Sequence, residues 1–163
     1  MGSQSKIAKK VYWAYIAGFL DGDGSLMLQL KKRKDGILKF RFMATICFYQ
    51  DTRHEKTLYW IRGVLGIGYV SRRNDGMTEL RINGFKQVRD ILIKLNPFIR
   101  FKKLQSNALL KACEILSETK FKMLTEQKLK NLVDCVLVIH SENYVTKKKK
   151  TRKELLQILG LTP

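Results

Sequence analysis

Cysteines, acidic residues and long apolar runs are all scarce in this 163-residue chain, and each scarcity excludes a class of protein. The three cysteines, Cys47, Cys113 and Cys135, are odd in number and have no close-spaced Cys or His partners. Neither a disulfide framework nor a zinc site is therefore indicated, and a reducing compartment fits. No apolar run approaches the roughly 20 residues that span a bilayer, and we see neither a secretory signal nor an Arg/Ser-rich transit peptide. We expect no association with a membrane.

The shortage of acids leaves a large positive charge. The chain has 32 Lys and Arg against 14 Asp and Glu, which gives a formal net charge of +18 and a pI near 10.0. Such a charge favours a polyanionic partner, because each phosphate that is neutralised releases bound counterions. The basic residues do not gather on one amphipathic helix, so nucleic acid is a better partner than a membrane surface.

The hydrophobic pattern predicts one domain in which helices alternate with β-hairpins. The length and the 45% hydrophobic content suffice for a single core. Apolar residues recur at helical spacing or alternate with polar ones, and Lys34-Asp35-Gly36 and Asn74-Asp75-Gly76 mark hairpin turns. The predicted helices are 11–20, 50–65, 85–95, 103–117, 125–141 and 151–159, and the predicted strands are 26–33, 39–48, 69–73 and 77–83.

This order repeats a strand-strand-helix unit and predicts an α+β fold. We expect an antiparallel sheet with helices packed on one face, buttressed by further helices near the C-terminus. Residues 1–10 are expected to be a flexible leader, and residues 11–163 a single domain with a helical C-terminal extension.

One face of the predicted sheet carries cations. Alternation leaves an apolar face and a polar face, and Arg, Lys, Gln and Thr side chains on the polar face can read base edges. A strand advances about 3.3 Å per residue, close to the rise of a DNA strand per base. Solvated charge is the ordinary meaning of such a face, but the surplus of +18 favours DNA binding. The predicted contact residues are Met27, Gln29, Lys31, Arg33, Lys39, Arg41, Met43, Thr45, Cys47, Ser71, Arg73, Glu79 and Arg81.

Two of the few acids stand together at the end of the first predicted helix, in Asp21-Gly22-Asp23-Gly24. The helix macrodipole disfavours negative charge there, so a compensating positive group is expected. Asp-Gly is also a common turn dipeptide, and without context it indicates only a turn. Here the turn joins a helix to the first strand of the cationic sheet, where carboxylates would meet a phosphodiester backbone. Mg²⁺ takes one or two carboxylates, water and phosphate oxygens, so these residues are a candidate site for metal-dependent hydrolysis.

The helix before the acids carries small residues, Ala14, Ala17 and Gly18, at spacings of three and four. Small residues on one stripe let two helix backbones approach closely. The stripe is compatible with a helix pair in a dimer and equally with ordinary packing in the core of one chain.

The stretch from Tyr15 to Gly24 also resembles the LAGLIDADG motif of homing endonucleases. Ala17-Gly18, the acidic pair and the flanking glycine all match, and the resemblance is clearest over residues 12–107. One copy of the motif resembles the branch of intron-encoded enzymes that act as homodimers. The resemblance implies an αββαββα fold with a saddle-shaped antiparallel sheet. It also implies a Mg²⁺-dependent double-strand break in a pseudo-palindromic DNA site of about 20 base pairs, which promotes intron mobility.

For individual residues, the resemblance implies that two motif helices meet at the dimer axis and that each contributes Asp23 to a shared active site. The Gly22 carbonyl would help to hold the metal, Gln50 and Lys102 would position water and phosphate, and Asp21 would serve as a cap. Mn²⁺ is expected to replace Mg²⁺, Ca²⁺ to bind without supporting cleavage, and no small-molecule cofactor is expected. The predicted dimer interface comprises Tyr12, Ala14, Tyr15, Ala17, Gly18 and Asp21.

Other functions are less well supported. Glu126-Gln127-Lys128 imitates part of another nuclease motif, but it lies in a helical pattern without a strand. The serious alternative is a non-catalytic protein of the same fold, either an intron maturase or a DNA-binding regulator. The presence of Asp23, Gln50 and Lys102 together favours an enzyme. The expected compartment is the chloroplast or mitochondrion that encodes the protein, or a prokaryotic cytoplasm.

Overall fold

The computed structural model describes residues 2–33, 40–120, 123–143 and 149–162. Helices and hairpins alternate as the hydrophobic pattern predicts, so the α+β class is confirmed. In these four stretches, no helix is both long enough and apolar enough to cross a membrane. The elements are α1 (Gly2–Asp23), β1 (Gly24–Lys32), β2 (Phe40–Asp51), η1 (Thr52–His54), α2 (Lys56–Leu65), β3 (Tyr69–Arg72), β4 (Met77–Asn83), α3 (Phe85–Leu95), α4 (Lys103–Glu118), α5 (Glu126–Glu142) and α6 (Arg152–Ile158).

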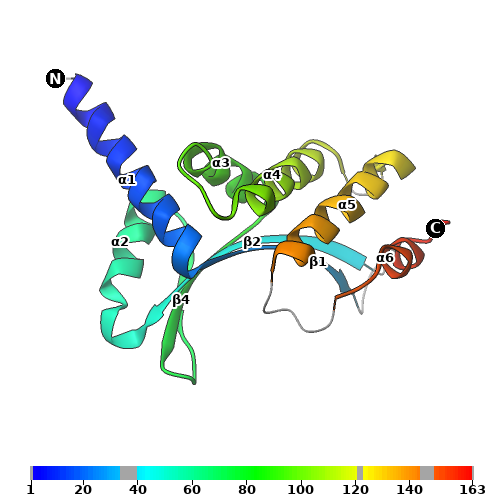
Figure 1. Cartoon of the computed structure of the whole chain (residues 1–163), viewed down its shortest axis with the longest axis horizontal. Helices are drawn as coiled ribbons and strands as arrows, with labels where there is room; N and C mark the ends of the chain where they lie inside the picture. The colour runs from blue at the N-terminus through cyan, green and yellow to red at the C-terminus, as the bar shows by residue number, and fades with distance from the viewer. Residues whose placement is uncertain (1, 34–39, 121–122, 144–148, 163) are drawn as a thin grey trace.

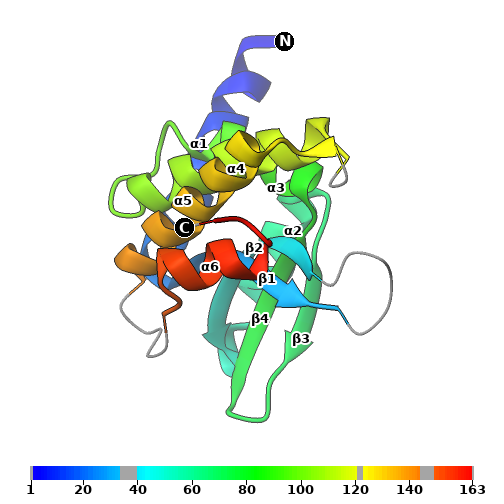
Figure 2. The ribbon, with the colours of Figure 1, turned by 90° about the vertical axis from the view of Figure 1, so that its right-hand side faces the viewer.

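The four strands form one antiparallel sheet in the order β1-β2-β4-β3. β1 pairs with β2 from Gly24↔Phe48 to Lys32↔Phe40. Figure 1 shows the long strands curving beneath α3, α4 and α5, and Figure 2 shows α6 beside the outer end of the sheet. The helices thus cover one face of the sheet and leave the other face uncovered.

The covered face of the sheet supplies the core. Every second residue of β1 and β2 is buried there and packs with Ile16 and Leu20 of α1. Burying a large apolar side chain contributes about 1.5–3 kcal/mol. A slip of one residue would place cations in the core, so this set also determines the strand register. The buried apolar residues that the strands contribute to this face are Leu26, Leu28, Phe42, Ala44, Ile46, Phe48, Leu80 and Ile82.

Helix α1 is longer than the pattern predicts. A flexible leader is expected over residues 1–10, whereas the structure is helical from Gly2 to Asp23. The first turns project beyond the rest of the domain, toward the upper left of Figure 1. At its other end α1 passes directly into β1. A Cβ at Gly24 would lie 2.4 Å from Leu20 Cδ1 and 2.8 Å from the Leu20 carbonyl oxygen, so this junction requires glycine.

The helix predicted over residues 50–65 begins later than expected. β2 continues to Asp51, and the short 3₁₀ turn η1 precedes α2. The Thr52 amide donates to the Gly76 carbonyl oxygen at 2.9 Å, which extends the ladder between β2 and β4. Asp51 Oδ1 accepts the Arg53 amide at 2.8 Å and starts the turn. Strand pairing over a long sequence separation therefore overrides the local helical pattern.

Candidate active site

The last turn of α1 carries both acids of the motif, and their surroundings differ. Asp21 faces the loop between α3 and α4, where its carboxylate accepts three backbone amides. These come from Arg100 at 2.6 Å, Lys102 at 3.0 Å and Phe101 at 3.3 Å. Hydrogen bonds to an ionised carboxylate are roughly twice as strong as neutral ones. Asp21 therefore caps this loop and fixes α1 against the start of α4.

Lys102, the N-cap residue of α4, closes the same junction from the other side. Its ammonium donates to the Asp21 carbonyl oxygen and, at 3.4 Å, to the Gly22 carbonyl oxygen. The end of a helix leaves such carbonyls without partners, and its dipole favours a cation. Burial lowers the pKa of Lys102, while the charges of Asp21 and Asp23 act in the opposite direction. Lys102 is thus the positive group that the acidic pair led us to expect.

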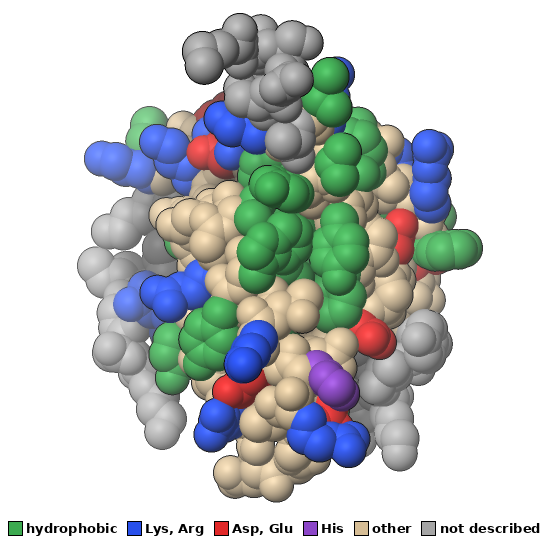
Figure 3. Space-filling model, turned by 90° about the vertical axis from the view of Figure 1, so that its left-hand side faces the viewer, with side chains coloured by type: hydrophobic (Ala, Val, Ile, Leu, Met, Phe, Trp, Pro, Cys, Tyr) green, Lys and Arg blue, Asp and Glu red, His purple; other side chains and the backbone are tan. Residues whose placement is uncertain are grey.

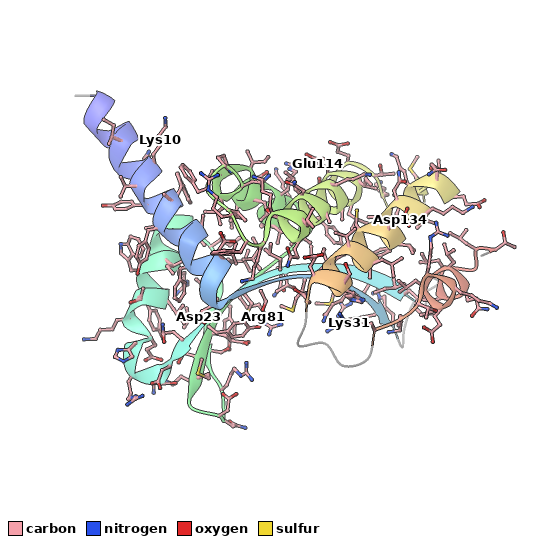
Figure 4. All side chains as sticks on the ribbon, viewed as in Figure 1. Lys10, Asp23, Lys31, Arg81, Glu114 and Asp134 are labelled. Carbon is pink, nitrogen blue, oxygen red and sulfur yellow. The ribbon has the colours of Figure 1, made fainter. Side chains whose placement is uncertain are left out.

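Asp23 is exposed at the point where α1 meets β1 (Figure 4). Within the described part of the chain, its carboxylate has no hydrogen-bond or ion-pair partner. No cluster of three or more His, Cys, Asp or Glu suited to a metal occurs among those residues. One carboxylate with the neighbouring Gly22 carbonyl still suits Mg²⁺, which takes few protein ligands and completes its shell with water and phosphate oxygens. Among the described residues, a single chain therefore offers a metal ion one exposed carboxylate and one carbonyl at this position.

Gln50 lies near the end of β2, two residues beyond the Gly24↔Phe48 pair. It points to the same side as Phe48, whose ring stacks on Phe19 of α1 with the centroids 6.1 Å apart. Gln50 Oε1 accepts the Asp51 amide at 2.8 Å, which leaves the side-chain nitrogen to donate elsewhere. The three residues expected to be catalytic, separated widely in the sequence, lie around the same end of α1.

The uncovered face of the sheet presents most of the predicted DNA contacts. Lys31, Arg33, Arg41 and Arg73 are exposed. A further set is half-buried and reaches the surface between them: Met27, Gln29, Met43, Ser71, Glu79 and Arg81. Lys39 lies outside the described residues.

Two predicted contacts, Thr45 and Cys47, differ from the others because neither side chain is accessible on this face. Thr45 is 2% exposed and donates to Asn83 Oδ1 at 2.7 Å, and Cys47 is 0% exposed. Both point to the expected side, but side chains of β4 cover them. Glu79 and Arg81 pair at 3.1 Å, and the Cys47 thiol donates to Glu79 Oε2 at 3.8 Å. Alternation predicts the side of a residue but not the reach of its longer neighbours.

Burial under these β4 side chains also changes the pKa values of two groups, Cys47 and Tyr49. Burial raises the pKa of the Cys47 thiol, and it raises the pKa of Tyr49 to about 12. Both groups are therefore protonated at neutral pH. The guanidinium of Arg73 lies 5.8 Å from the centre of the Tyr49 ring, so this part of the uncovered sheet face is an ordered polar layer.

The outward side of α1 forms an apolar surface together with α2. Tyr12 and Tyr15 each meet the Trp60 ring edge-on, with centroids 5.5 Å apart. Figure 3 shows apolar side chains along the middle of this face and charged ones around them. Trp60 lies outside the motif helix and was not among the predicted interface residues. The rings border a hollow of about 510 Å³, also lined by Val11, Lys56 and Thr57.

The small residues of α1 divide between the two interpretations of the stripe. Ala17 is 0% exposed and packs in the core of its own chain, so it is not available to a dimer partner. The Asp21 carboxylate is likewise occupied by its own chain. Ala14 is half-buried, whereas Gly18 is exposed and a Cβ there would meet nothing within 4 Å. Of the predicted interface, Tyr12, Tyr15 and Gly18 are the exposed members.

An exposed acid close to a lysine, at the edge of a cationic antiparallel sheet, suits an enzyme that acts on nucleic acid. Comparison with known proteins gives the family. The model of the LAGLIDADG endonuclease family matches residues 16–116. DNA endonuclease I-CvuI of Chlorella vulgaris is 34% identical over 108 residues, which are 66% of this chain and 67% of the relative. DNA endonuclease I-CreI of Chlamydomonas reinhardtii is 32% identical over 111 residues, 68% of each protein. The chain belongs to the LAGLIDADG endonuclease family.

Solved structures agree with this assignment. The structure of I-CvuI with the I-CreI target and Mg, in which the DNA is not cleaved, matches with a TM-score of 0.74 at 28% identity. I-CvuI with its own target and Ca matches with the same TM-score at 27% identity. Each match covers 96% of this chain and 99% of the relative. The fold and the endonuclease family expected from the motif are confirmed.

Proposed function

We propose that this chain is a site-specific homing endonuclease that acts as a homodimer. It would bind a pseudo-palindromic DNA site of about 20 base pairs and make a Mg²⁺-dependent double-strand break. Cleavage of an intronless copy of the host gene would promote intron mobility. The strongest support is Asp23 itself, an exposed carboxylate with unused oxygens at the end of α1 in a chain of this family.

Asp23 and the Gly22 carbonyl would hold the metal ion. The contact between Lys102 and that carbonyl is long, at 3.4 Å, so the oxygen keeps a lone pair for an ion. I-CvuI was solved with DNA in the presence of Mg and of Ca, which supports Mg²⁺ as the cofactor and Ca²⁺ as an ion that permits binding. Mn²⁺ is expected to replace Mg²⁺. When bound, the ion polarises the phosphate and lowers the pKa of a bound water.

The side chains of the protein would place the reacting groups. Gln50, with its oxygen held by the Asp51 amide, would orient the attacking water through its side-chain nitrogen. Lys102 would hold positive charge beside the scissile phosphate. Two backbone carbonyls already fix its ammonium, so it requires no rearrangement during the reaction. One preorganised group of this kind typically contributes about 10²–10³ in rate.

A second copy of the chain would complete the proposed active site. Each chain offers one exposed Asp23, and the outward side of α1 next to it carries Gly18, Tyr12 and Tyr15. A two-fold interface is self-complementary, because the same surface is used by both copies. Pairing α1 with the α1 of a second chain would bring two Asp23 carboxylates to one axis. The two reacting phosphates would then lie on opposite strands.

The uncovered sheet face would follow the major groove on each side of that axis. β1 has 9 residues and β2 has 12, and at about 3.3 Å per residue they reach about 30 to 40 Å. That length corresponds to roughly nine to twelve base pairs for each subunit. The charge of +18 makes binding strongly dependent on salt.

The host compartment belongs to the same proposal. All three cysteines are free and buried, as expected for a reducing environment. Both curated relatives come from organisms with organelles, Chlorella vulgaris and Chlamydomonas reinhardtii. We propose that the protein acts in the organelle that encodes it.

A selection of long DNA sites tests the proposed function. Sites that the protein retains in Ca²⁺ are incubated with Mg²⁺, and the native protein is compared with Asp23→Asn. We expect double-strand breaks from the native protein and binding without cutting from the variant. Binding without any Mg²⁺-dependent break by the native protein would identify a maturase or regulator instead. A complex that sediments with one protein chain per site would refute the homodimer.

A further inference from the structure

A polar cluster beside the candidate active site connects two strands to η1 and α2. It centres on Glu55, a carboxylate whose side chain is only 13% exposed. Arg72 of β3 donates to it from Nε at 3.0 Å and from Nη2 at 2.6 Å, and the Thr78 hydroxyl of β4 donates at 2.9 Å. The Thr52 hydroxyl lies 3.0 Å from that of Thr78. These four residues are called the Glu55 clamp.

The clamp contacts residues that lie directly opposite one another on three neighbouring strands, here called one row of the sheet. Gln50 pairs with Thr78 across β2 and β4, and Thr78 pairs with Arg72 across β4 and β3. Directly opposite residues of antiparallel strands share a side, so all three point to the side on which Glu55 lies. The neighbours of Arg72, which are Ser71 and Arg73, point to the opposite, DNA-facing side. One carboxylate thus holds the row that ends in a catalytic candidate and begins beside two DNA contacts.

The charge of Glu55 is well compensated. Arg72 lowers the pKa of Glu55, and Thr78 lowers it further, so the carboxylate is ionised at neutral pH. Its place just before α2 also suits a negative charge, because the dipole of a helix is positive at that end. A poorly exposed charge is tolerated only when it is paired and hydrogen-bonded, and every partner here comes from the turn or the hairpin.

The edge strand β3 is short and is attached through β4 and α2. It is 4 residues long, and β4 is its one partner among the described strands. Arg72 and Glu55 therefore tie its outer part to the turn that follows Gln50. Movement of the β3–β4 hairpin on DNA would pull on Glu55 and Thr78, and through the strand pair on Gln50.

We propose that Glu55 is a positioning residue that couples DNA reading by the β3–β4 hairpin to the orientation of Gln50. This coupling rests on the proposed function, because Gln50 has a catalytic role only in an enzyme. Glu55 itself touches neither DNA nor metal. It fixes the orientation of the β3–β4 hairpin relative to the Gln50 side chain.

Two substitutions test the coupling. Glu55→Gln keeps the shape and removes the charge, and Thr78→Val keeps the shape and removes the hydroxyl. We expect single-turnover cleavage of a site selected by the native protein to slow by about 10- to 100-fold in each, since a displacement of about 1 Å costs that much. Affinity for the same DNA in Ca²⁺ should stay within about threefold. The double variant should cleave no more slowly than Glu55→Gln, because both changes disrupt the same hydrogen bond between Thr78 and Glu55.

Base preference, measured by binding a site library in Ca²⁺, provides a second readout. Glu55→Gln should relax the preference at the base pairs that Ser71 and Arg73 contact. It should leave the preference unchanged at the base pair that Gln29 contacts. A matched control is Arg152→Ala, which breaks an ion pair of 3.2 Å with Asp134 between α5 and α6. That variant should keep the native cleavage rate and preference.

Circular dichroism confirms that each variant is folded at the assay temperature. Native cleavage and native base preference in folded Glu55→Gln and Thr78→Val would overturn the coupling and leave the clamp a structural feature. If the native protein binds but does not cut, the proposed function fails. The base preference of Glu55→Gln in Ca²⁺ then still shows whether the Glu55 clamp fixes the position of the β3–β4 hairpin.

Discussion

The two sides of the last turn of α1 use the same residue type for different purposes. Asp21 and Asp23 are two positions apart, which at 3.6 residues per turn places them on nearly opposite sides of the helix. Three amides of the α3–α4 loop saturate Asp21. Asp23 faces solvent and has no hydrogen-bond partner in the described part of the chain. The acid that serves structure is the one whose lone pairs are occupied, and the acid suited to a metal is the one whose oxygens are unused.

Replacing Asp23 should have the largest effect on cleavage and very little on stability. Asp23→Asn removes the carboxylate that we propose holds the metal, and losing several kcal/mol of transition-state stabilisation should slow cleavage by about 10³-fold or more. The free energy of unfolding should change by less than about 0.5 kcal/mol, as for a surface site. Single-turnover cleavage and urea unfolding measure the two quantities. A large loss of stability would remove the contrast with Asp21.

Lys102 lies between the two sides, so its charge should control the alkaline limit of cleavage. Lys102→Met is expected to slow cleavage by about 10²-fold. Burial lowers the pKa of Lys102 below its usual 10.5, so the folded protein loses this proton before the unfolded chain does. Between the two pKa values the unfolded chain binds more protons, and the contribution of Lys102 to stability rises with pH while cleavage falls.

A pH–rate profile of Lys102→Arg checks this assignment. Arginine stays charged, so the alkaline decline should move to higher pH in the variant. If the decline stays where it is in the native protein, another group causes it.

Asp21→Asn should show the reverse pattern. The three amides would lose a charged acceptor, which should reduce the free energy of unfolding by about 2 kcal/mol. Cleavage by the folded fraction should decrease much less than in Asp23→Asn. Urea unfolding with cleavage measured well below the midpoint separates the two effects. Unchanged stability would show that other contacts hold the α3–α4 loop.

The uncovered sheet face allows the same distinction between occupied and unused groups. Gln29→Ala should weaken discrimination at one base pair by about 1–3 kcal/mol. Cys47→Ala should leave base preference unchanged, because the thiol is 0% exposed beneath Glu79 and Arg81. Library binding in Ca²⁺ compares them. Altered preference in Cys47→Ala would mean that the cover opens on DNA.

The smallest effect is expected at the outer end of the sheet. Lys150 lines a hollow of about 260 Å³ with Lys31 and His140. If it contacts a phosphate, Lys150→Ala should reduce the slope of log affinity against log salt by about 1 and leave base preference unchanged. The slope of Lys111→Ala, an exposed lysine on α4, should stay at the native value. Equal slopes in both variants would exclude the phosphate contact.

Hydrophobic periodicity predicted most of the fold, because buried side chains recur at regular intervals along strands and helices. Each predicted strand and helix has a counterpart, and the apolar residues of β1 and β2 are those of the core. The errors lie where long-range bonds compete with local pattern. Thr52 pairs with Gly76, so α2 begins at Lys56, six residues after the predicted start.

The candidate site was predictable in its residues but not in their surroundings. The motif located Asp21 and Asp23, and the helix macrodipole, which disfavours negative charge at that end, called for a cation nearby. That Asp21 binds residues 100–102 depends on how α3 and α4 dock. The cover over Cys47 and the clamp at Glu55 likewise join residues more than ten positions apart.

The sequence by itself determined the class of fold, the basic face of the strands and the family, because these depend on composition, on periods of two and 3.6, and on a contiguous motif. Only the tertiary structure showed which groups hold the Asp21 carboxylate, which strand residues are covered, and which face of α1 remains open. Those properties depend on the neighbours that folding brings to each side chain, and neighbours distant in sequence leave no local pattern.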